Sequence, residues 1–366
     1  MWKIINEKIR HLREKIKKLN LDGMIISNPV NIKYLCNIES EGTLLITRKE
    51  NVFITYTMYI EDVKATLTIN DEIIVVDTRD ISKEDYDAFF LFCENVGFEE
   101  NYVTYEQYKV LKQKFRINNL VETENLIEKQ REVKDAEEIE NIKKACEITD
   151  KCFEHIRKFI KIGTTEKQIA WEIDRLFKEN GAEDLAFPTI VAIGENTAYP
   201  HWKPGDREVR MADPILIDMG CKYNGYCSDM TRTIFMGCIL EEIKPIYDLV
   251  LKNQITTTKE MKEYGSIKTI SKIAECDFKV NNYDLIHAVG HGVGLDIHER
   301  PAISFKNDTF LKENMVLACE PGIYLPGKYG VRIEDTVLVG KNEGVALTKS
   351  PKTYVVIWHL LKSIVK

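Results

Sequence analysis

One stretch constrains the fold more than any other because it predicts a β-hairpin: residues 215–233, with the sequence ILIDMGCKYNGYCSDMTRT. Asn224 and Gly225 both accept the positive φ angles of a type I′ turn, the strongest short signal for a two-residue hairpin loop. Counting outward from this turn places Asp218 and Asp229 on facing strands, two positions out of register. Because side chains alternate between the faces of a strand, the two aspartates share a face, about 7–8 Å apart at the backbone.

The same register pairs Asp218 with Thr231 and brings both carboxylates within reach of one cation. Two acids on one face repel each other and are unfavourable to bury, so they are either exposed to solvent or neutralised by a positive group. Asp218 ends the apolar run ILID, which we expect to be buried. This favours a positive group between the acids without removing the exposed alternative.

The composition is that of an ordinary globular protein, with 44% hydrophobic and 30% charged residues among 366, enough for one or two domains. The net charge of −7 argues against nucleic acid or an anionic membrane as a partner, and no run approaches the ~18 apolar residues of a membrane span. The chain starts without a signal-peptide pattern, and its nine cysteines are scattered with no CxxC pair. We therefore expect a cytoplasmic protein with reduced cysteines.

The sequence changes character near residue 125, which predicts two domains. Strand and helix patterns alternate in residues 1–125 and predict a small α/β domain, with a helix over 5–20, strands over 23–27, 43–47, 51–55 and 72–77, and a helix over 58–68. We predict a linker over 126–137 and a second domain over 138–366 that opens with a long amphipathic helix. The residues GTTE, 163–166, predict a helix end and a new start, and further helices are expected over about 166–180, 239–262 and 265–275.

The second domain contains the same strand–turn–strand pattern twice, with an acid on each strand. In residues 315–339, MVLACEPG…VRIEDTVLV, an apolar strand again ends in an acid and a second strand carries another. These acids are Glu320 and Glu334, and each copy of the pattern follows roughly two helices. The sequence therefore predicts an internally duplicated domain in which each half supplies two acids.

Three of the seven histidines fall in one glycine-rich stretch, residues 286–299, IHAVGHGVGLDIHE. His287 and His291 have the i, i+4 spacing of a helical zinc site, but no Glu follows His287 and the glycines disfavour a helix. Glycines around His291 instead predict an extended segment that another backbone or a ligand approaches closely. The third histidine of the stretch is His298, and His201, which follows Tyr-Pro, is a fourth candidate.

Four carboxylates and one histidine then form an oxygen-rich ligand set: Asp218, Asp229, His291, Glu320 and Glu334. Such a set suits Mn, Mg, Fe or Co better than structural zinc, which prefers a closed site of cysteine and histidine. Five ligands with bridging acids exceed the needs of one ion, whereas two ions about 3.5–4 Å apart use them and activate a bridging water. Arg332 shares a face with Glu334 and either pairs with that acid or binds a substrate carboxylate, and composition favours the ion pair.

With these motifs the chain resembles the methionine-aminopeptidase/prolidase metallopeptidases, in their proline-specific branch of Xaa-Pro dipeptidases and aminopeptidase P. Residues 1–125 resemble the creatinase-type N-terminal domain and residues 135–366 the catalytic domain. The resemblance implies an α+β protein: an internally duplicated pita-bread catalytic domain preceded by a smaller α/β domain. It also implies that the motifs DMG, SDMTRT, GHGVG, EPG and RIED supply the metal ligands Asp218, Asp229, His291, Glu320 and Glu334.

The resemblance further implies a dinuclear peptidase that hydrolyses the bond before proline in Xaa-Pro dipeptides through a metal-bridging hydroxide. Two divalent ions are implied, Mn²⁺ first, with Co, Zn or Fe as alternatives. His201, His298 and Glu320 are the implied catalytic residues, with Glu320 as proton shuttle, and His287 and Arg332 are implied to hold the proline end. The partner is a small peptide with proline in second position, and the protein is implied to form a homodimer.

Three alternatives stay open. Aminopeptidase P cleaves longer peptides and differs in loops that one sequence does not identify. A creatinase-like hydrolase uses the same fold without metal, and a non-catalytic binding module loses the ligands, so the intact set of five argues against both. One departure lies in the first domain, where relatives often carry TDxRY and residues 55–59 read TYTMY, which puts any role of that segment in doubt.

Overall fold

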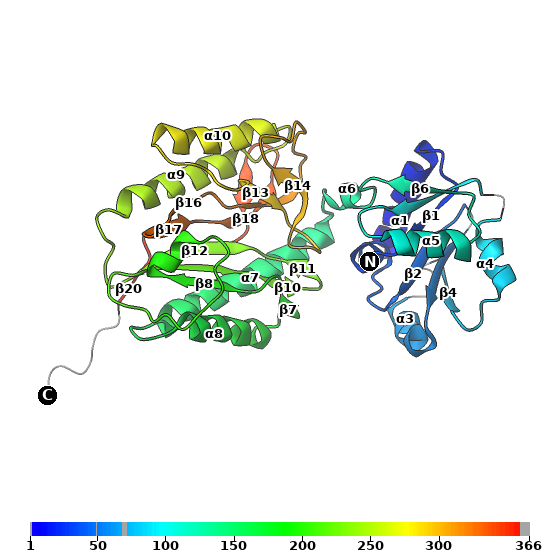
Figure 1. Cartoon of the computed structure of the whole chain (residues 1–366), viewed down its shortest axis with the longest axis horizontal. Coiled ribbons are helices and arrows are strands. Elements are labelled where there is room, and N and C mark those ends of the chain that lie inside the picture. Colours follow the sequence, from blue (N-terminus) through cyan, green and yellow to red (C-terminus); the bar gives the residue numbers. More distant parts are fainter. Residues whose placement is uncertain (1, 49, 68–71, 92, 359–366) are drawn as a thin grey trace. The chain divides into compact units, whose positions relative to one another are not determined.

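The computed structural model describes residues 2–48, 50–67, 72–91 and 93–358, and the chain divides into two units, Met1–Arg131 and Glu132–Lys366 (Figure 1). The division falls inside the predicted linker, residues 126–137, part of which is helical as α6 (Glu128–Arg131). The next helix, α7 (Ala136–Phe159), begins at the cap formed by Asp135 and Glu138 and is the predicted amphipathic helix.

The N-terminal unit has a six-stranded mixed sheet in the order β4-β3-β2-β1-β5-β6. Its strands are β1 (Gly23–Ile26), β2 (Gly42–Ile46), β3 (Asn51–Thr55), β4 (Ile73–Asp77), β5 (Asn95–Glu99) and β6 (Asn119–Thr123). Its helices, besides α6, are α1 (Trp2–Lys18), α2 (Pro29–Cys36), α3 (Ile60–Thr66), α4 (Lys83–Phe89) and α5 (Tyr105–Lys114), with a 3₁₀ turn η1 (Thr57–Tyr59). The predicted α/β class and the predicted strands are confirmed.

Helix α2 is an element that the sequence analysis missed. The Asn28-Pro29 pair reads as the end of a strand, but Asn28 caps a helix by accepting a hydrogen bond from the Val30 amide at 3.0 Å. Proline suits the first helical position because its missing N–H has no partner there in any helix. The same pair therefore both ends β1 and starts α2.

The buried carboxylate of Glu99 holds the start of α2. It accepts hydrogen bonds from the amides of Ser27 (2.6 Å) and Asn28 (2.8 Å) and from the Asn31 side chain (2.7 Å). Burial is the largest influence on this group and raises its pKa from 4.5 to about 7, against the opposing effect of these donors.

A carbon-13 carboxyl titration of the folded protein is expected to give Glu99 a midpoint of about 7, and Glu99→Gln identifies the resonance. Because the folded state binds this proton more tightly than the unfolded chain, the contribution to stability is fully present below about pH 4.5 and is lost as the pH rises through about 7. A midpoint near 4.5 would show that the three donors outweigh burial.

The C-terminal unit pairs two helices with each half of its strands. The helices are α7, α8 (Glu166–Glu179), α9 (Lys244–Glu260) and α10 (Ile267–Val280), with a 3₁₀ turn η2 (Gly194–Ala198). Helix α7 packs on α8, α9 packs on α10, and the strands lie between the pairs in Figure 1. Helix α9 begins five residues later than predicted because Pro245 sits in its first turn, where proline is favoured.

The strands of this unit form sheets in the orders β20-β12-β9-β8, β11-β10-β7, β14-β13-β15-β18-β19 and β16-β17. Their bounds are β7 (Asp184–Leu185), β8 (Ile190–Ile193), β9 (Pro214–Met219), β10 (Cys221–Tyr223), β11 (Tyr226–Cys227), β12 (Met230–Met236), β13 (Gly290–Gly292), β14 (Glu299–Ile303), β15 (Val316–Cys319), β16 (Gly322–Leu325), β17 (Tyr329–Arg332), β18 (Asp335–Val339), β19 (Gly344–Ala346) and β20 (Val356–Ile357).

The predicted hairpin forms with the predicted register. Asn224 and Gly225 have φ angles of 47° and 79°, Tyr223 pairs with Tyr226, and Asp218 pairs with Thr231. The ladder is interrupted between β9 and β10, where a Cβ on Gly220 would lie 2.1 Å from the Ser228 carbonyl oxygen, so this close approach requires glycine.

The predicted duplication is also present. Strand β9 pairs with β12 and continues into the hairpin β10–β11, and in the same way β15 pairs with β18 and continues into the hairpin β16–β17. Three of the four acids lie at the breaks in these two ladders, next to strand ends: Asp229, Glu320 and Glu334. Each half has its own buried apolar core against its helices.

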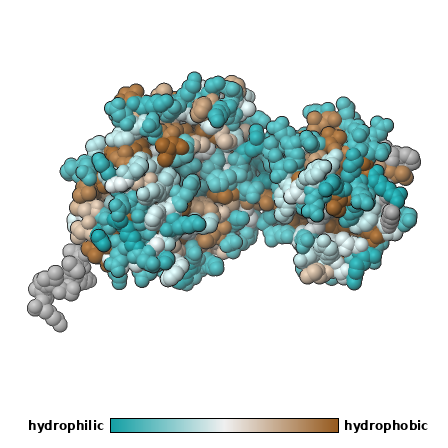
Figure 2. All heavy atoms as spheres, in the orientation of Figure 1, coloured by the Kyte–Doolittle hydropathy of each residue, from teal (hydrophilic) through white to brown (hydrophobic). Residues whose placement is uncertain are grey.

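On the face shown in Figure 2, hydrophilic residues predominate and hydrophobic residues form small separate patches. Among residues 2–358, apart from the gaps named above, none of the helices combines the length and the apolar character that crossing a bilayer requires.

Candidate metal centre

A cavity of about 500 Å³ in the C-terminal unit is lined by every residue that the sequence analysis selected. They are His201, Asp218, Asp229, His287, His291, His298, Glu320, Arg332 and Glu334. These residues come from both halves of the duplicated domain, so the two halves meet at this cavity.

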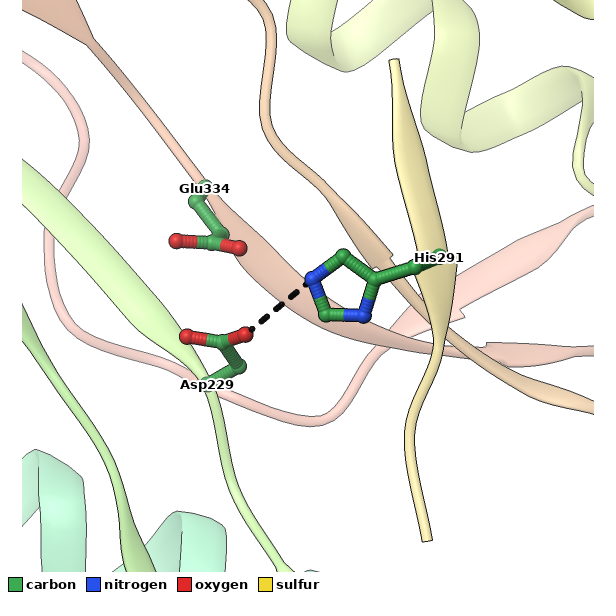
Figure 3. A group of neighbouring side chains, drawn as sticks. All are labelled: Asp229, His291 and Glu334. Atoms are coloured by element: carbon green, nitrogen blue, oxygen red, sulfur yellow. Dashed lines mark ion pairs between the residues drawn. The ribbon is translucent and has the colours of Figure 1, made fainter. Parts of the chain in front are cut away.

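Three of the predicted ligands form a tight cluster in which one atom from each lies within 4.8 Å of the others: Asp229, His291 and Glu334. Figure 3 shows the His291 ring directed toward the Asp229 carboxylate, with Glu334 above both. The His291 Nε2 atom lies 3.6 Å from Asp229 Oδ2 and 3.7 Å from Glu320 Oε1. Asp218 lines the same cavity from β9.

Hydrogen bonds between the two halves fix these acids. The Thr231 hydroxyl on β12 donates to Glu334 Oε2 at 2.6 Å, and the Glu334 amide donates to the Thr231 carbonyl at 3.1 Å. Reciprocally, the Asp229 amide donates to the Thr336 hydroxyl at 2.9 Å, and that hydroxyl donates to the Asp229 carbonyl at 2.8 Å. The threonine of each half therefore positions the acid of the other.

His291 is held by the short strand β13, as its glycines predict. A Cβ on Gly290 would lie 1.9 Å from the Ala318 carbonyl oxygen, so the neighbouring strand approaches too closely for any side chain. The His291 Nδ1–H donates to the Gly292 carbonyl at 3.0 Å, which leaves the lone pair of Nε2 facing the carboxylates. Burial lowers the pKa of His291 to about 4, so the ring is neutral near pH 7.

The cluster has the electrostatics of a cation site. Burial, followed by repulsion from the neighbouring acids, raises the pKa values of Asp229 and Glu334 well above their usual range, and burial raises that of Glu320 to about 7. Within the described part of the chain, the buried Oδ1 atom of Asp218 has no hydrogen-bond partner. A neutral imidazole lone pair facing several carboxylates is unfavourable until a cation binds between them, so this donor set fits divalent metal.

Arg332 pairs with Asp218 and not with the nearby Glu334, because the predicted single strand is divided: Arg332 ends β17, and Glu334 lies in the break before β18. Its Nη2 atom lies 2.6 Å from Asp218 Oδ2, and its Nε donates to the Thr231 hydroxyl at 3.0 Å. Its Nη1 donates to the Pro200 carbonyl at 3.2 Å and to the Tyr324 hydroxyl at 2.9 Å. At least four of its five N–H groups are thus used within the protein, and the ion pair expected from composition forms with a different acid.

Tyr324 is a site residue that the sequence analysis missed. Its hydroxyl accepts from Arg332 and lies 3.1 Å from His287 Nε2, and because His287 Nδ1 donates to the Ala288 carbonyl at 2.8 Å, the Tyr324 hydroxyl donates to Nε2. Burial lowers the pKa of His287 to about 4 and keeps it neutral. The signal was present, because counting the register of the second hairpin puts Tyr324 and Arg332 on one face.

The two remaining histidines, His201 and His298, also line the cavity. His298 contacts His291 edge to face, with ring centroids 4.3 Å apart, and burial lowers its pKa, followed by the effect of His201. His201 is exposed and follows the 3₁₀ turn η2.

Comparison with known proteins agrees with this geometry. Metallopeptidase family M24 matches residues 140–341, and the Creatinase/Prolidase N-terminal domain matches residues 8–133. The Xaa-Pro dipeptidase of Pyrococcus horikoshii is 34% identical over 354 residues, covering 95% of this chain and 99% of the relative.

Two solved structures extend the comparison. The Xaa-Pro dipeptidase of Bacillus anthracis has a TM-score of 0.89 at 32% identity, covering 96% of this chain and 99% of its own. The X-Pro aminopeptidase of Thermotoga maritima has a TM-score of 0.85 at 31% identity, covering 94% and 100%. The predicted resemblance and pita-bread fold are confirmed, and the chain belongs to metallopeptidase family M24, with an N-terminal domain of the creatinase/prolidase type.

Proposed function

We propose that this protein is an Xaa-Pro dipeptidase that uses two divalent metal ions. One observation carries the proposal: buried acids and a neutral histidine from both halves converge on a cavity that three further histidines line. The relatives named Xaa-Pro dipeptidase, which match nearly the whole chain, support the choice of substrate. A metal-free hydrolase or a non-catalytic module would leave this costly set of buried acids without a use.

In this proposal the metals would be held by Asp218, Asp229, His291, Glu320 and Glu334. Divalent ions bound there supply Lewis acidity toward the scissile carbonyl and a water that loses a proton near neutral pH. Mn²⁺ is the preferred ion because four of the five ligands are hard oxygen donors, and Co, Zn and Fe are the alternatives.

The protein's own residues handle the proton and the developing charge. The pKa of Glu320 of about 7 suits a carboxylate that takes a proton from the attacking water and returns it to the proline nitrogen. His298 or His201 donates a hydrogen bond to the carbonyl oxygen as negative charge develops on it. His287 contacts the proline end, and Arg332 shapes that end through the Pro200 carbonyl and the Tyr324 hydroxyl.

The position of Lys203 supports a dipeptide, and not a longer peptide, as the preferred substrate. This residue lines the cavity and is exposed, so its ammonium can pair with the free carboxylate of a bound dipeptide. A longer peptide carries an uncharged amide at that position. Xaa-Pro aminopeptidase is the second candidate function, because the similar T. maritima structure carries the name X-Pro aminopeptidase.

Matched Xaa-Pro and Xaa-Pro-Yaa substrates test the proposal after metal removal and reconstitution with Mn, Co, Zn or Fe. We expect no turnover without metal, the highest with Mn, and a kcat/KM about tenfold higher for the dipeptide. Lys203→Met is expected to lower kcat/KM for the dipeptide and not for the tripeptide. Equal cleavage of both lengths would favour the aminopeptidase, and turnover by the metal-free protein would contradict the proposal.

We further propose the homodimer and the cytoplasmic location that the family resemblance implies. Sedimentation equilibrium of the purified protein tests the dimer, and a single species at the monomer mass of 42.4 kDa would contradict it.

A further inference from the structure

The carboxylate of Glu166 is fully buried, at 0% exposure, and both of its oxygens are used by one distant segment. Its Oε1 accepts from the Ile193 amide at 2.9 Å and from the Asn196 side chain at 2.8 Å. Its Oε2 accepts from the Trp202 indole at 2.9 Å and from the Gly205 amide at 2.8 Å. One carboxylate therefore binds four donors spread over residues 193–205.

These donors flank the turn that carries His201. Two precede it and two follow it, so the carboxylate ties both ends of the segment 193–205 to the start of α8. Pro200, His201 and Trp202 of this segment line the cavity. A second contact also fixes this turn: Arg332, which lines the same cavity as the predicted metal ligands, donates a hydrogen bond to the Pro200 carbonyl.

Other residues already cap the helix that carries Glu166. The N-terminus of α8 is already capped by Thr165, which accepts from the Gln168 amide, and by the Gln168 side chain, which accepts from the Thr165 amide. Within the described part of the chain, the hydrogen bonds that the Glu166 carboxylate accepts all come from the segment 193–205. Because burying a carboxylate is unfavourable unless it is fully hydrogen-bonded, its presence at this position indicates a role for the segment it binds.

We infer that Glu166 is a positioning residue: it fixes the segment 193–205 so that His201 faces the scissile carbonyl. The inference rests on the proposed function, because it takes His201 as a group that contacts the substrate. Glu166 is not among the residues that line the cavity, so in this inference it acts through the segment that it binds.

A double-mutant cycle tests this role with an Xaa-Pro dipeptide and the metal-loaded enzyme. Glutamine keeps one acceptor oxygen and turns an NH₂ group toward the other donors, so Glu166→Gln is expected to lower kcat/KM about tenfold, chiefly in kcat, with unchanged metal content. In a His201→Ala background the same change is expected to cost less than about twofold, because the group that it positions is absent. Equal losses in both backgrounds would overturn the inference, as would a Glu166→Gln enzyme within about twofold of wild type.

Glu195→Gln is the matched control. Glu195 lies on the same segment, but its side chain is 62% exposed and pairs with Arg207. This change is expected to leave kcat/KM within about twofold in both backgrounds, since exposed pairs contribute little. If Glu166→Gln does not fold, Asn196→Ala removes one of the four bonds and enters the same cycle, where a smaller loss that also vanishes with His201→Ala is expected.

The emission of Trp202 supplies a readout independent of turnover. Its indole N–H donates to Glu166, so Glu166→Gln is expected to shift the emission, and the shift is expected to disappear in a Trp202→Phe background. A wild-type enzyme that cleaves no Xaa-Pro dipeptide would overturn the proposed function, whereas unchanged Trp202 emission would overturn the contact on which the positioning role depends.

Discussion

Replacing Asp229 with asparagine is expected to abolish metal loading and turnover together, and to make the metal-free protein more stable. Asp229 lies in the tight cluster with His291 and Glu334, so its loss would remove one of the proposed metal ligands. Loss of even an outer partner of a metal ligand lowers activity about 10–100-fold, so a larger loss is expected here. Metal content by mass spectrometry and kcat/KM are the measurements.

The gain in stability follows from the charges. Burial and the carboxylates of Glu334, Asp218 and Glu320 all raise the pKa of Asp229, which means that the folded protein disfavours its charged form. Asparagine has the same shape without the charge, so the free energy of unfolding in excess chelator is expected to rise by about 1–3 kcal/mol. An exposed acid of the same unit serves as control: Asp206→Asn, whose side chain is 83% exposed, is expected to change neither metal content nor stability.

Two outcomes would contradict this prediction separately. Two equivalents of metal retained by Asp229→Asn would remove Asp229 from the ligand set. A chelated variant that is less stable than the chelated wild type would mean that the cluster is not a set of repelling charges held for a cation.

Much of the site could be predicted because its signals are local. The Asn224-Gly225 turn fixes the register of one hairpin, and alternation along a strand then places Asp218 and Asp229 on one face. The glycines around His291 likewise predict a close approach of backbone, which Gly290 confirms. The strand–turn–strand pattern of residues 215–233 recurs in residues 315–339, and this recurrence identified the two acids of the second half.

The remaining features depend on contacts between segments that are distant in the sequence, and no local sequence pattern indicates such contacts. The partner of Arg332 is Asp218, 114 positions away in the other half, whereas the sequence offered only the neighbouring Glu334. Glu166 reads as part of a helix start, and nothing near it in the sequence indicates the segment 193–205. Lys203 could not be assigned because its position depends on how that same segment folds over the cavity.

Arg332→Met is expected to destabilise the chelated C-terminal unit by about 3–5 kcal/mol, the range for breaking a buried ion pair from one side. Arg332 is 2% exposed and pairs with Asp218, whose other oxygen is already unpartnered among the described residues. The variant leaves that carboxylate buried without its cation, and it also leaves the Pro200 carbonyl and the Tyr324 hydroxyl without a donor. Urea unfolding in excess chelator measures the loss, and turnover is expected to fall with it.

A second substitution separates charge from packing. If the uncompensated charge dominates, adding Asp218→Asn to Arg332→Met is expected to recover part of the lost stability, although the double variant is expected to be inactive because it lacks a metal ligand. Lys167→Met, which breaks an exposed pair with Asp206 whose side chains are 43% and 83% exposed, is the control and is expected to cost about 0–1 kcal/mol. Should the double variant be less stable than Arg332→Met alone, the role of Arg332 would lie in filling space and binding the Pro200 and Tyr324 oxygens, and not in balancing the charge of Asp218.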